Sequence, residues 1–247
     1  MSCAKIAIIG GSSLNDLEQL SSSSPVSSET KYGQASSGIR SGQFAGKQVV
    51  FVARHGADYQ TPPHLINYRA NIQRLKELGV EKILAVNTVG GINSKMPAGC
   101  IVIPDQLIDY SWGRHSTYSE QGNVIFIEFE KPFDSQLRTT LLDSAVQADL
   151  DCIDFGVYGC TQGPRLETAA EINRLERDGC DLVGMTAMPE AALARELGIA
   201  YASICLVVNP AAGRSEQPIS MAQVEKIASV GMVKVVQLLE HAVSAIV

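Results

Sequence analysis

The sequence predicts an α/β protein with a mixed, mostly parallel twisted sheet that is flanked by helices. Two observations favour this class. Short runs of Val, Ile and Leu alternate along the chain with longer segments of helical periodicity. These runs are almost continuously apolar, which is typical of strands buried on both faces of a parallel sheet. No linker, repeat or low-complexity boundary interrupts the alternation, so residues 1–247 are interpreted as a single domain.

The strands are predicted where a short apolar run ends at glycine, proline or a polar residue. In chain order they cover residues 5–10, 48–54, 82–88, 101–103, 152–160, 182–185 and 201–208. Residues 21–28 differ, because they are rich in serine, contain a proline and have no hydrophobic period. This segment is therefore predicted to be a loop.

The helices are predicted between and after these strands. They cover residues 67–78, 135–148, 167–177, 189–197 and 220–247. Gly79 follows the first helix and Gly179 the third, as glycine often follows the last helical residue. Pro189 opens the fourth helix, where the missing N–H of proline is tolerated, and Gly198 ends it.

Composition limits the partners and the compartment. The net charge is −6, so the chain lacks the basic surface of a dedicated nucleic-acid binder. The six cysteines form no CxxC pair, which predicts free thiols, no disulfide and no metal site. Residues 1–11 lack the features of a signal peptide, and no stretch approaches the ~20 apolar residues of a membrane span. We expect a cytoplasmic protein with no nucleic-acid and no membrane partner.

Polar and glycine-rich residues follow the predicted strands, at the edge where ligands of parallel sheets bind. Ser12, Thr88 and Thr186 can donate hydroxyl hydrogen bonds to one anion. Arg54 can hold two oxygens of that anion through its planar fork. The chain has no GxxxxGK[ST] motif and no GxGxxG spacing after a strand. The pattern therefore predicts a site for free phosphate rather than for a nucleotide in a P-loop.

Each of these signals also has an ordinary explanation when it is taken alone. Paired glycines after a strand are commonly just a turn, and Asn209-Pro210 is typical of one. Arg54 and His55 fit an exposed pair on the surface. Thr186 fits the N-cap of the helix that Pro189 opens. The functional interpretation depends on their shared position at strand ends.

Several ordered motifs resemble the trimeric nucleoside phosphorylases, and among them the methylthioadenosine and methylthioinosine phosphorylases. The resemblance extends from about residue 5 into the last helix. Its motifs are 8–12 (IIGGS), 53–56 (ARHG), 67–71 (NYRAN), 105–109 (DQLID), 163–165 (GPR), Met185-Thr186 and Pro189-Glu190.

The resemblance implies that inorganic phosphate attacks the anomeric carbon of a nucleoside while the purine leaves. No metal or organic cofactor is implied, because phosphate is a co-substrate. A homotrimer is implied, with a neighbouring subunit completing the 5′ end of the site. Met185 is expected against the ribose. The residues implied to hold phosphate are Ser12, Arg54, His55, Thr88 and Thr186.

The residues around the base indicate a 6-oxopurine. Family members that cleave adenine nucleosides carry a Thr-Asp-x-Asp run after the last strand, whereas this chain has Asn209, followed by Pro210 and Ala211. An amide can donate to O6 and accept from N7–H. Glu167, which follows Leu166, can accept the N1–H of hypoxanthine. The catalytic contacts on the leaving base are therefore assigned to Glu167 and Asn209. The alternative role for Glu167 is to stabilise its own helix from the first turn.

The 5′ end of the nucleoside is expected to meet an apolar lining. Tyr59 and Phe126 lie near positions where some relatives have histidines, and Met221 starts the last helix. Simple core packing is the alternative for all of them. With the resemblance, these residues make S-methyl-5′-thioinosine the expected substrate, in purine and methionine salvage. Alternatives are methylthioadenosine, a broader set of 6-oxopurine nucleosides such as inosine and guanosine, or a non-catalytic protein that binds phosphate or nucleosides.

Overall fold

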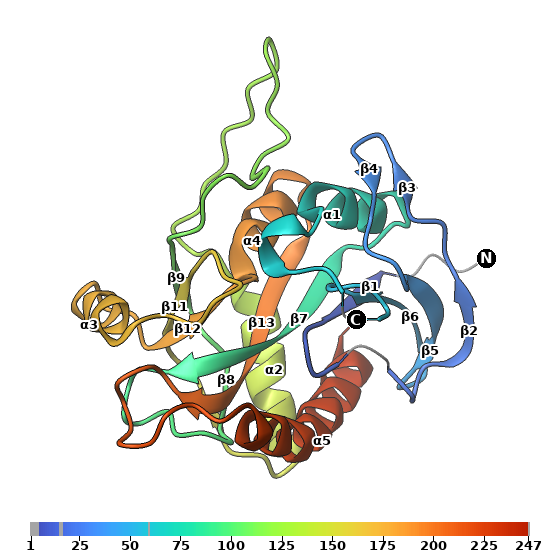
Figure 1. Ribbon diagram of the computed structural model, residues 1–247. Helices are drawn as coiled ribbons and strands as arrows, with labels where there is room; N and C mark the ends of the chain where they lie inside the picture. Colours follow the sequence, from blue (N-terminus) through green and yellow to red (C-terminus); the bar gives the residue numbers. More distant parts are fainter. Residues whose placement is uncertain (1–4, 15–16, 59, 247) are drawn as a thin grey trace.

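A computed structural model describes residues 5–14, 17–58 and 60–246. In this part of the chain an 11-stranded sheet runs in the order β10-β8-β13-β7-β1-β6-β5-β2, with β12, β11 and β9 extending from β7 (Figure 1). The strands are β1 (Ile6–Gly10), β2 (Ser21–Pro25), β3 (Glu29–Thr30), β4 (Gly33–Gln34), β5 (Arg40–Phe44), β6 (Lys47–Ala53), β7 (Lys82–Gly91), β8 (Ile101–Val102), β9 (Gln106–Asp109), β10 (Cys152–Ile153), β11 (Val157–Cys160), β12 (Leu182–Gly184) and β13 (Ala200–Pro210). The short strands β3 and β4 pair separately.

The α-helices follow the predicted positions closely. They are α1 (Tyr68–Glu77), α2 (Ser135–Gln147), α3 (Ala169–Arg177), α4 (Ala187–Glu196) and α5 (Met221–Ala245). The 3₁₀ turn η1 (Pro63–Leu65) was not predicted. Asn67 caps α1 by accepting from the Ala70 N–H at 3.1 Å. Gly79 follows this helix with φ +82°, a conformation that favours glycine.

The central strands are parallel, and their carboxyl ends meet on one side of the sheet. β1 pairs in parallel with both β6 and β7, and β13 pairs in parallel with β7. The outer strands β5 and β2 are antiparallel, as is the pair β12–β7. The predicted class, a mixed and mostly parallel sheet flanked by helices, is confirmed.

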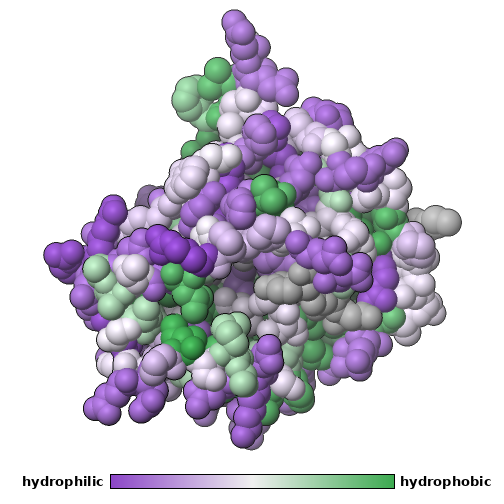
Figure 2. Space-filling view, in the orientation of Figure 1, coloured by the Kyte–Doolittle hydropathy of each residue, from purple (hydrophilic) through white to green (hydrophobic). Residues whose placement is uncertain are grey.

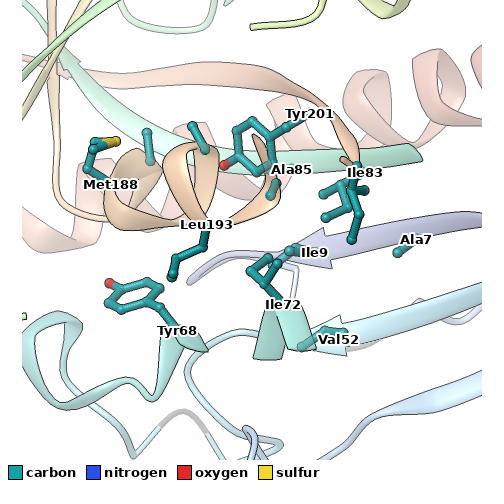
Figure 3. Packing of buried hydrophobic residues seen from close by; sticks show 14 of the residues in the cluster. Ala7, Ile9, Val52, Tyr68, Ile72, Ile83, Ala85, Met188, Leu193 and Tyr201 are labelled. Atoms are coloured by element: carbon teal, nitrogen blue, oxygen red, sulfur yellow. The ribbon is translucent and has the colours of Figure 1, made fainter. Parts of the chain in front are cut away.

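Alternating residues of the central strands fill separate cores on the two faces of the sheet. Ala7 and Ile9 of β1 pack in the core beneath α1 and α4. Ile6 and Ile8, from the same strand, pack in the core beneath α2 and α5. Figure 3 shows Leu193 of α4 pointing from its helix toward Tyr68 of α1. Because both faces are covered, the central strands β1, β6, β7 and β13 are apolar along most of their length.

Two strand predictions were wrong. Residues 152–160 form two strands rather than one, and Gly156 lies between them at φ +151°. Residues 21–25 form the exposed edge strand β2, which pairs with β5, instead of a loop. An edge strand outside the core is held by backbone hydrogen bonds and needs no hydrophobic period, so the serine-rich sequence gave no signal.

The segment between β9 and α2, residues 110–134, is an arm whose far part stands out from the body of the molecule (Figure 1, green), while Tyr118 and Phe133 pack in the core. Its residues Val124 and Phe126 are 64% and 92% exposed. Figure 2 shows hydrophobic atoms at the surface of this arm. Large exposed apolar side chains of this kind are typical of surfaces that meet another protein chain.

Helix α5 is long and apolar enough, by length and composition, to cross a membrane. Its buried residues, among them Leu238 and Leu239, instead pack in the same core as Leu206 of β13 and Leu141 of α2. This is the burial pattern of a core helix. The expectation of no membrane partner stays a prediction.

The two sides of α5 provide a stability test. Val235 is fully buried and Val233 is 70% exposed. We expect Val235→Ala to lower the free energy of unfolding by about 2 kcal/mol, because it deletes two buried methyl groups and leaves a cavity. Val233→Ala should change it by less than about 0.5 kcal/mol, because alanine is also the better helix former. Urea unfolding measures both, and equal effects would contradict the assigned helix faces.

Candidate functional site

A cavity of about 240 Å³ opens at the carboxyl ends of β1, β7, β12 and β13. It brings together residues that lie far apart in the sequence. Those among the predicted site residues are Ser12, Arg54, His55, Thr88, Leu166, Glu167, Met185, Thr186, Asn209, Ala211 and Met221. The strand-end argument therefore identified a real cavity, and the roles of these residues stay predictions.

Pro210 is the exception among the predicted contacts. It is exposed and lines a neighbouring hollow under residues 215–220, rather than this cavity. A register shift in β13 between Val207 and Asn209 turns the end of the strand, so that Asn209 pairs with Gly90 and reaches the cavity. The carbonyl of Pro210 instead accepts a hydrogen bond from Asn209 Nδ2 at 2.7 Å.

Hydroxyl groups from neighbouring strand ends line one part of the cavity. Ser12 Oγ, after β1, lies 2.8 Å from Thr88 Oγ1 on β7. Thr186 Oγ1 donates to Asn87 Oδ1 at 2.8 Å, and Asn87 Nδ2 donates to Ser203 Oγ at 2.8 Å. Thr186 occupies the N-cap position of α4, but its side chain makes no capping hydrogen bond. The ordinary explanation of Thr186 as a side-chain cap is therefore wrong.

Asn87 was missed by the sequence analysis. It is 2% exposed, lines the cavity and holds the hydroxyl of Thr186. The only local signal was an amide inside the apolar run of β7, because a buried polar side chain requires partners. Its partner Thr186 is 99 residues away in sequence, so spacing could not reveal the pair.

Arg54 forms a fully buried ion pair with Glu190 of α4. Its Nε and Nη2 donate to the two carboxylate oxygens at 2.5 and 2.9 Å, and Nη1 donates to the Val86 carbonyl at 3.1 Å. Tyr201 also donates to Glu190, at 3.0 Å. Burial would lower the pKa of Arg54, but the charge and hydrogen bonds of Glu190 raise it above its ordinary value. Arg54 therefore stays charged, and the interpretation as a surface pair is wrong.

This ion pair changes how Arg54 can meet an anion. The Nε–Nη2 edge of the guanidinium, which could hold two anion oxygens, is occupied by Glu190. The Nη1 edge lies beside Gly11, where an added Cβ would be 3.3 Å from it. Glycine at this position therefore keeps backbone and guanidinium donors close together on the cavity wall.

His55 lies next to Arg54 on the cavity wall and is 6% exposed. Burial and the charge of Arg54 lower its pKa, although the Thr61 carbonyl, 2.9 Å from Nδ1, opposes the shift. The imidazole is therefore neutral at pH 7. In the neutral ring Nδ1 carries the proton, because a carbonyl can only accept.

Glu167 and Asn209 also line the cavity. Thr161 Oγ1 donates to Glu167 Oε1 at 2.6 Å. Glu167 precedes the N-cap of α3, where Thr168 and Glu171 form a reciprocal capping box. Glu171, and not Glu167, therefore stabilises the first turn, and the alternative role proposed for Glu167 is wrong.

The apolar end of the cavity is formed by Met221 together with Ile219 and Val224, near the start of α5. Phe126 does not lie on this wall, because it is on the exposed arm. At 92% exposed it is not packed in the core either, so the core-packing alternative is wrong for Phe126, and its expected place at the 5′ end stays a prediction. Tyr59 lies outside the described residues.

No group of three or more His, Cys, Asp or Glu that could hold a metal ion is found in residues 5–14, 17–58 and 60–246. The cavity offers hydroxyls, one guanidinium, an imidazole, a carboxylate and two amides. These groups suit an anion at one end and a polar planar molecule at the other.

Comparison with known proteins places these features in a family. The model of the phosphorylase superfamily matches residues 5–244. The chain belongs to this superfamily. This phosphorylase is 50% identical to a probable S-methyl-5′-thioinosine phosphorylase from Pseudomonas syringae pv. tomato. The match covers 97% of the chain and 98% of the relative. It is also 43% identical to a probable 6-oxopurine nucleoside phosphorylase from Thermococcus kodakarensis, over 89% of the chain and 84% of the relative.

A solved structure has the same fold. The methylthioadenosine phosphorylase from Schistosoma mansoni, in complex with adenine, superposes with a TM-score of 0.90 at 30% sequence identity. The match covers 98% of this phosphorylase and 91% of that chain. The fold and family are thus shared with proteins named for different purine bases, so the base must be argued from the side chains of the site.

The neutral state of His55 is testable by pH titration. We expect the His55 imidazole to titrate by NMR below its ordinary pKa of 6.5. The folded protein then binds this proton less readily than the unfolded chain, so stability falls as pH drops below about 6.5. His55→Gln should remove this part of the pH dependence, whereas His115→Gln, at an exposed position, should not. A His55 that titrates above 6.5 would refute the assignment.

Proposed function

We propose that this phosphorylase cleaves S-methyl-5′-thioinosine with inorganic phosphate, giving hypoxanthine and 5-methylthioribose 1-phosphate for purine and methionine salvage. One observation carries the proposal. Glu167 and Asn209 line the same cavity as the hydroxyls of Ser12, Thr88 and Thr186. A 6-oxopurine and an anion can therefore meet in one site, with the ribose between them.

Phosphate is proposed to bind at the end lined by the three hydroxyls, Arg54 and His55. A phosphate oxygen forms a bond to the anomeric carbon while the bond from that carbon to the purine nitrogen breaks. The transition state has oxocarbenium character, so catalysis rests on holding the nucleophile in line and stabilising the departing base. No metal or organic cofactor enters this scheme.

The base is proposed to lie between Glu167 and Asn209. The carboxylate of Glu167 accepts N1–H, and the amide of Asn209 donates to O6 and accepts from N7–H. Asn209 Nδ2 has two hydrogens, so its hydrogen bond to the Pro210 carbonyl leaves one for O6. Adenine has no N1–H, and it would leave these groups unpaired at a cost of about 1–3 kcal/mol each. Leu166 and Ala211 are apolar contacts for the ring.

The 5′ end is proposed to take a methylthio group. Met221, Ile219 and Val224 offer it an apolar wall. The relative from Pseudomonas syringae, with its name of probable S-methyl-5′-thioinosine phosphorylase, supports the same choice. A broader 6-oxopurine nucleoside phosphorylase is the second candidate, favoured by Glu167 and Asn209 alone.

A homotrimer in the cytoplasm is proposed as the working form. The arm exposes Val124 and Phe126 in the single chain, and a neighbouring subunit is proposed to cover them while the arm completes its 5′ pocket. Cys100, Cys152, Cys160, Cys180 and Cys205 are free thiols, as in reducing compartments. Sedimentation tests the assembly: a monomer at high concentration would contradict it.

The substrate is tested by base release from methylthioinosine, methylthioadenosine and inosine, each with and without phosphate. We expect cleavage only with phosphate, and the highest kcat/KM for methylthioinosine. Fastest cleavage of methylthioadenosine would overturn the assignment of the base. Equal rates for inosine and methylthioinosine would favour the second candidate.

The role of Asn209 is tested by Asn209→Asp. We expect the ratio of kcat/KM for methylthioinosine to that for methylthioadenosine to fall by about tenfold or more, because a carboxylate repels O6 and accepts from the exocyclic amine of adenine. Asn173→Asp, on α3 and away from the cavity, is the matched control. An unchanged ratio in Asn209→Asp would contradict the proposed contact with O6.

A further inference from the structure

Arg114 lies on the arm, outside the cavity, and donates to backbone carbonyls of two separate segments. Nη1 donates to the carbonyls of Met185 at 2.8 Å and Met188 at 2.5 Å. Nη2 donates to the carbonyls of Thr161 at 3.2 Å and Gln162 at 2.9 Å. One guanidinium therefore bridges the chain after β11 to the chain after β12.

Each bridged segment leads directly to a wall of the cavity. Thr161, whose carbonyl accepts from Arg114, donates its own hydroxyl to the Glu167 carboxylate at 2.6 Å. In the sequence, Met185 and Met188 lie on either side of Thr186, which also lines the cavity. Arg114 therefore contacts Thr161, which holds the carboxylate proposed to bind the base, and it contacts both neighbours of the segment that contains Thr186, which is proposed to bind phosphate.

The guanidinium itself is held in place by further contacts. Nε donates to Gln162 Oε1 at 3.2 Å, and the charged group lies 5.4 Å from the centre of the Tyr68 ring. Tyr68 is buried on α1, and its hydroxyl donates to the carbonyl of Pro63, which lines the cavity. A planar fork with five fixed N–H donors can serve all these acceptors at once, whereas the point charge of lysine cannot.

We infer that Arg114 is a positioning residue that holds the Glu167 wall and the Met185–Thr186 wall of the cavity at a fixed separation. This inference rests on the proposed function, because the separation matters for a nucleoside and phosphate that react with each other. The arm then has a role within its own subunit, since it delivers the side chain that sets the width of the site.

The test compares Arg114→Met and Arg114→Lys with a matched control, Arg138→Met. Arg138 also donates to three backbone carbonyls, those of Ile103, Pro104 and Asp154, but none of these residues lines the cavity. Arg114→Met and Arg138→Met therefore each remove a guanidinium that connects backbone segments. The two variants differ in whether those segments line the cavity.

We expect both Arg114 variants to raise the KM for methylthioinosine and for phosphate together and to lower kcat/KM by about 100-fold, the loss typical of reacting groups misplaced by about 1 Å. A third variant, Arg114→Ala, removes the whole side chain beyond Cβ, and added guanidinium should restore part of its activity. Arg138→Met should lose stability and keep both KM values. Unchanged KM values in Arg114→Met, or equal changes in Arg138→Met, would overturn the inference.

A second readout separates this inference from the proposed function. Hydrogen–deuterium exchange follows residues 161–167 and 185–188 without any substrate. We expect faster exchange in both segments of Arg114→Lys and no change there in Arg138→Met. If the unmodified protein cleaves no nucleoside, the proposed function fails, and the exchange data still decide whether Arg114 holds the two walls. Unchanged exchange would refute the inference even in an active enzyme.

Discussion

The buried ion pair between Arg54 and Glu190 is the constraint around which the site is built. Two charges without access to water are costly unless their hydrogen-bond groups are satisfied. Here Glu190 receives both Nε and Nη2 of Arg54 and the hydroxyl of Tyr201, while Val86 receives Nη1. These residues come from α4, β13, β7 and the end of β6. The pair is complete only when α4 is docked on the sheet, so the fold and this end of the cavity form together.

The same pair sets the electrostatics of the cavity. Glu190 balances the charge of Arg54, and the neighbouring His55 is kept neutral by burial and by Arg54. Strong binding of an anion then depends on aimed hydrogen bonds from hydroxyls and backbone more than on an excess of positive charge. This is consistent with the proposed binding of one small anion by a protein whose net charge is −6.

The parts of the fold that could be predicted are those whose burial leaves a pattern in the sequence. The central strands and the helices were predicted within a few residues, because apolar runs and capping residues are local signals. The edge strand β2 and the break at Gly156 carry no such pattern. In the site, strand-end residues could be identified, whereas Glu190 as the partner of Arg54 could not, since 136 residues separate the two. Arg114 lies in an irregular arm where neither period nor spacing marks a role.

The two ends of the cavity differ in how tightly the fold holds them. Arg54, Asn87, Thr186 and Glu190 are each at most 7% exposed and are connected by hydrogen bonds to the core strands. Leu166 and Met221 are 47% and 60% exposed, Glu167 lies before the first turn of α3, and Asn209 lies beyond the register shift of β13. Substitution at these positions removes little core packing, so the residues proposed to contact the base and the 5′ group can change at low cost in stability. The buried end cannot vary in this way. Such a fold can keep one reaction with phosphate while its preferred nucleoside changes. This accounts for the fold being shared by a relative named for methylthioadenosine and a relative named for 6-oxopurine nucleosides.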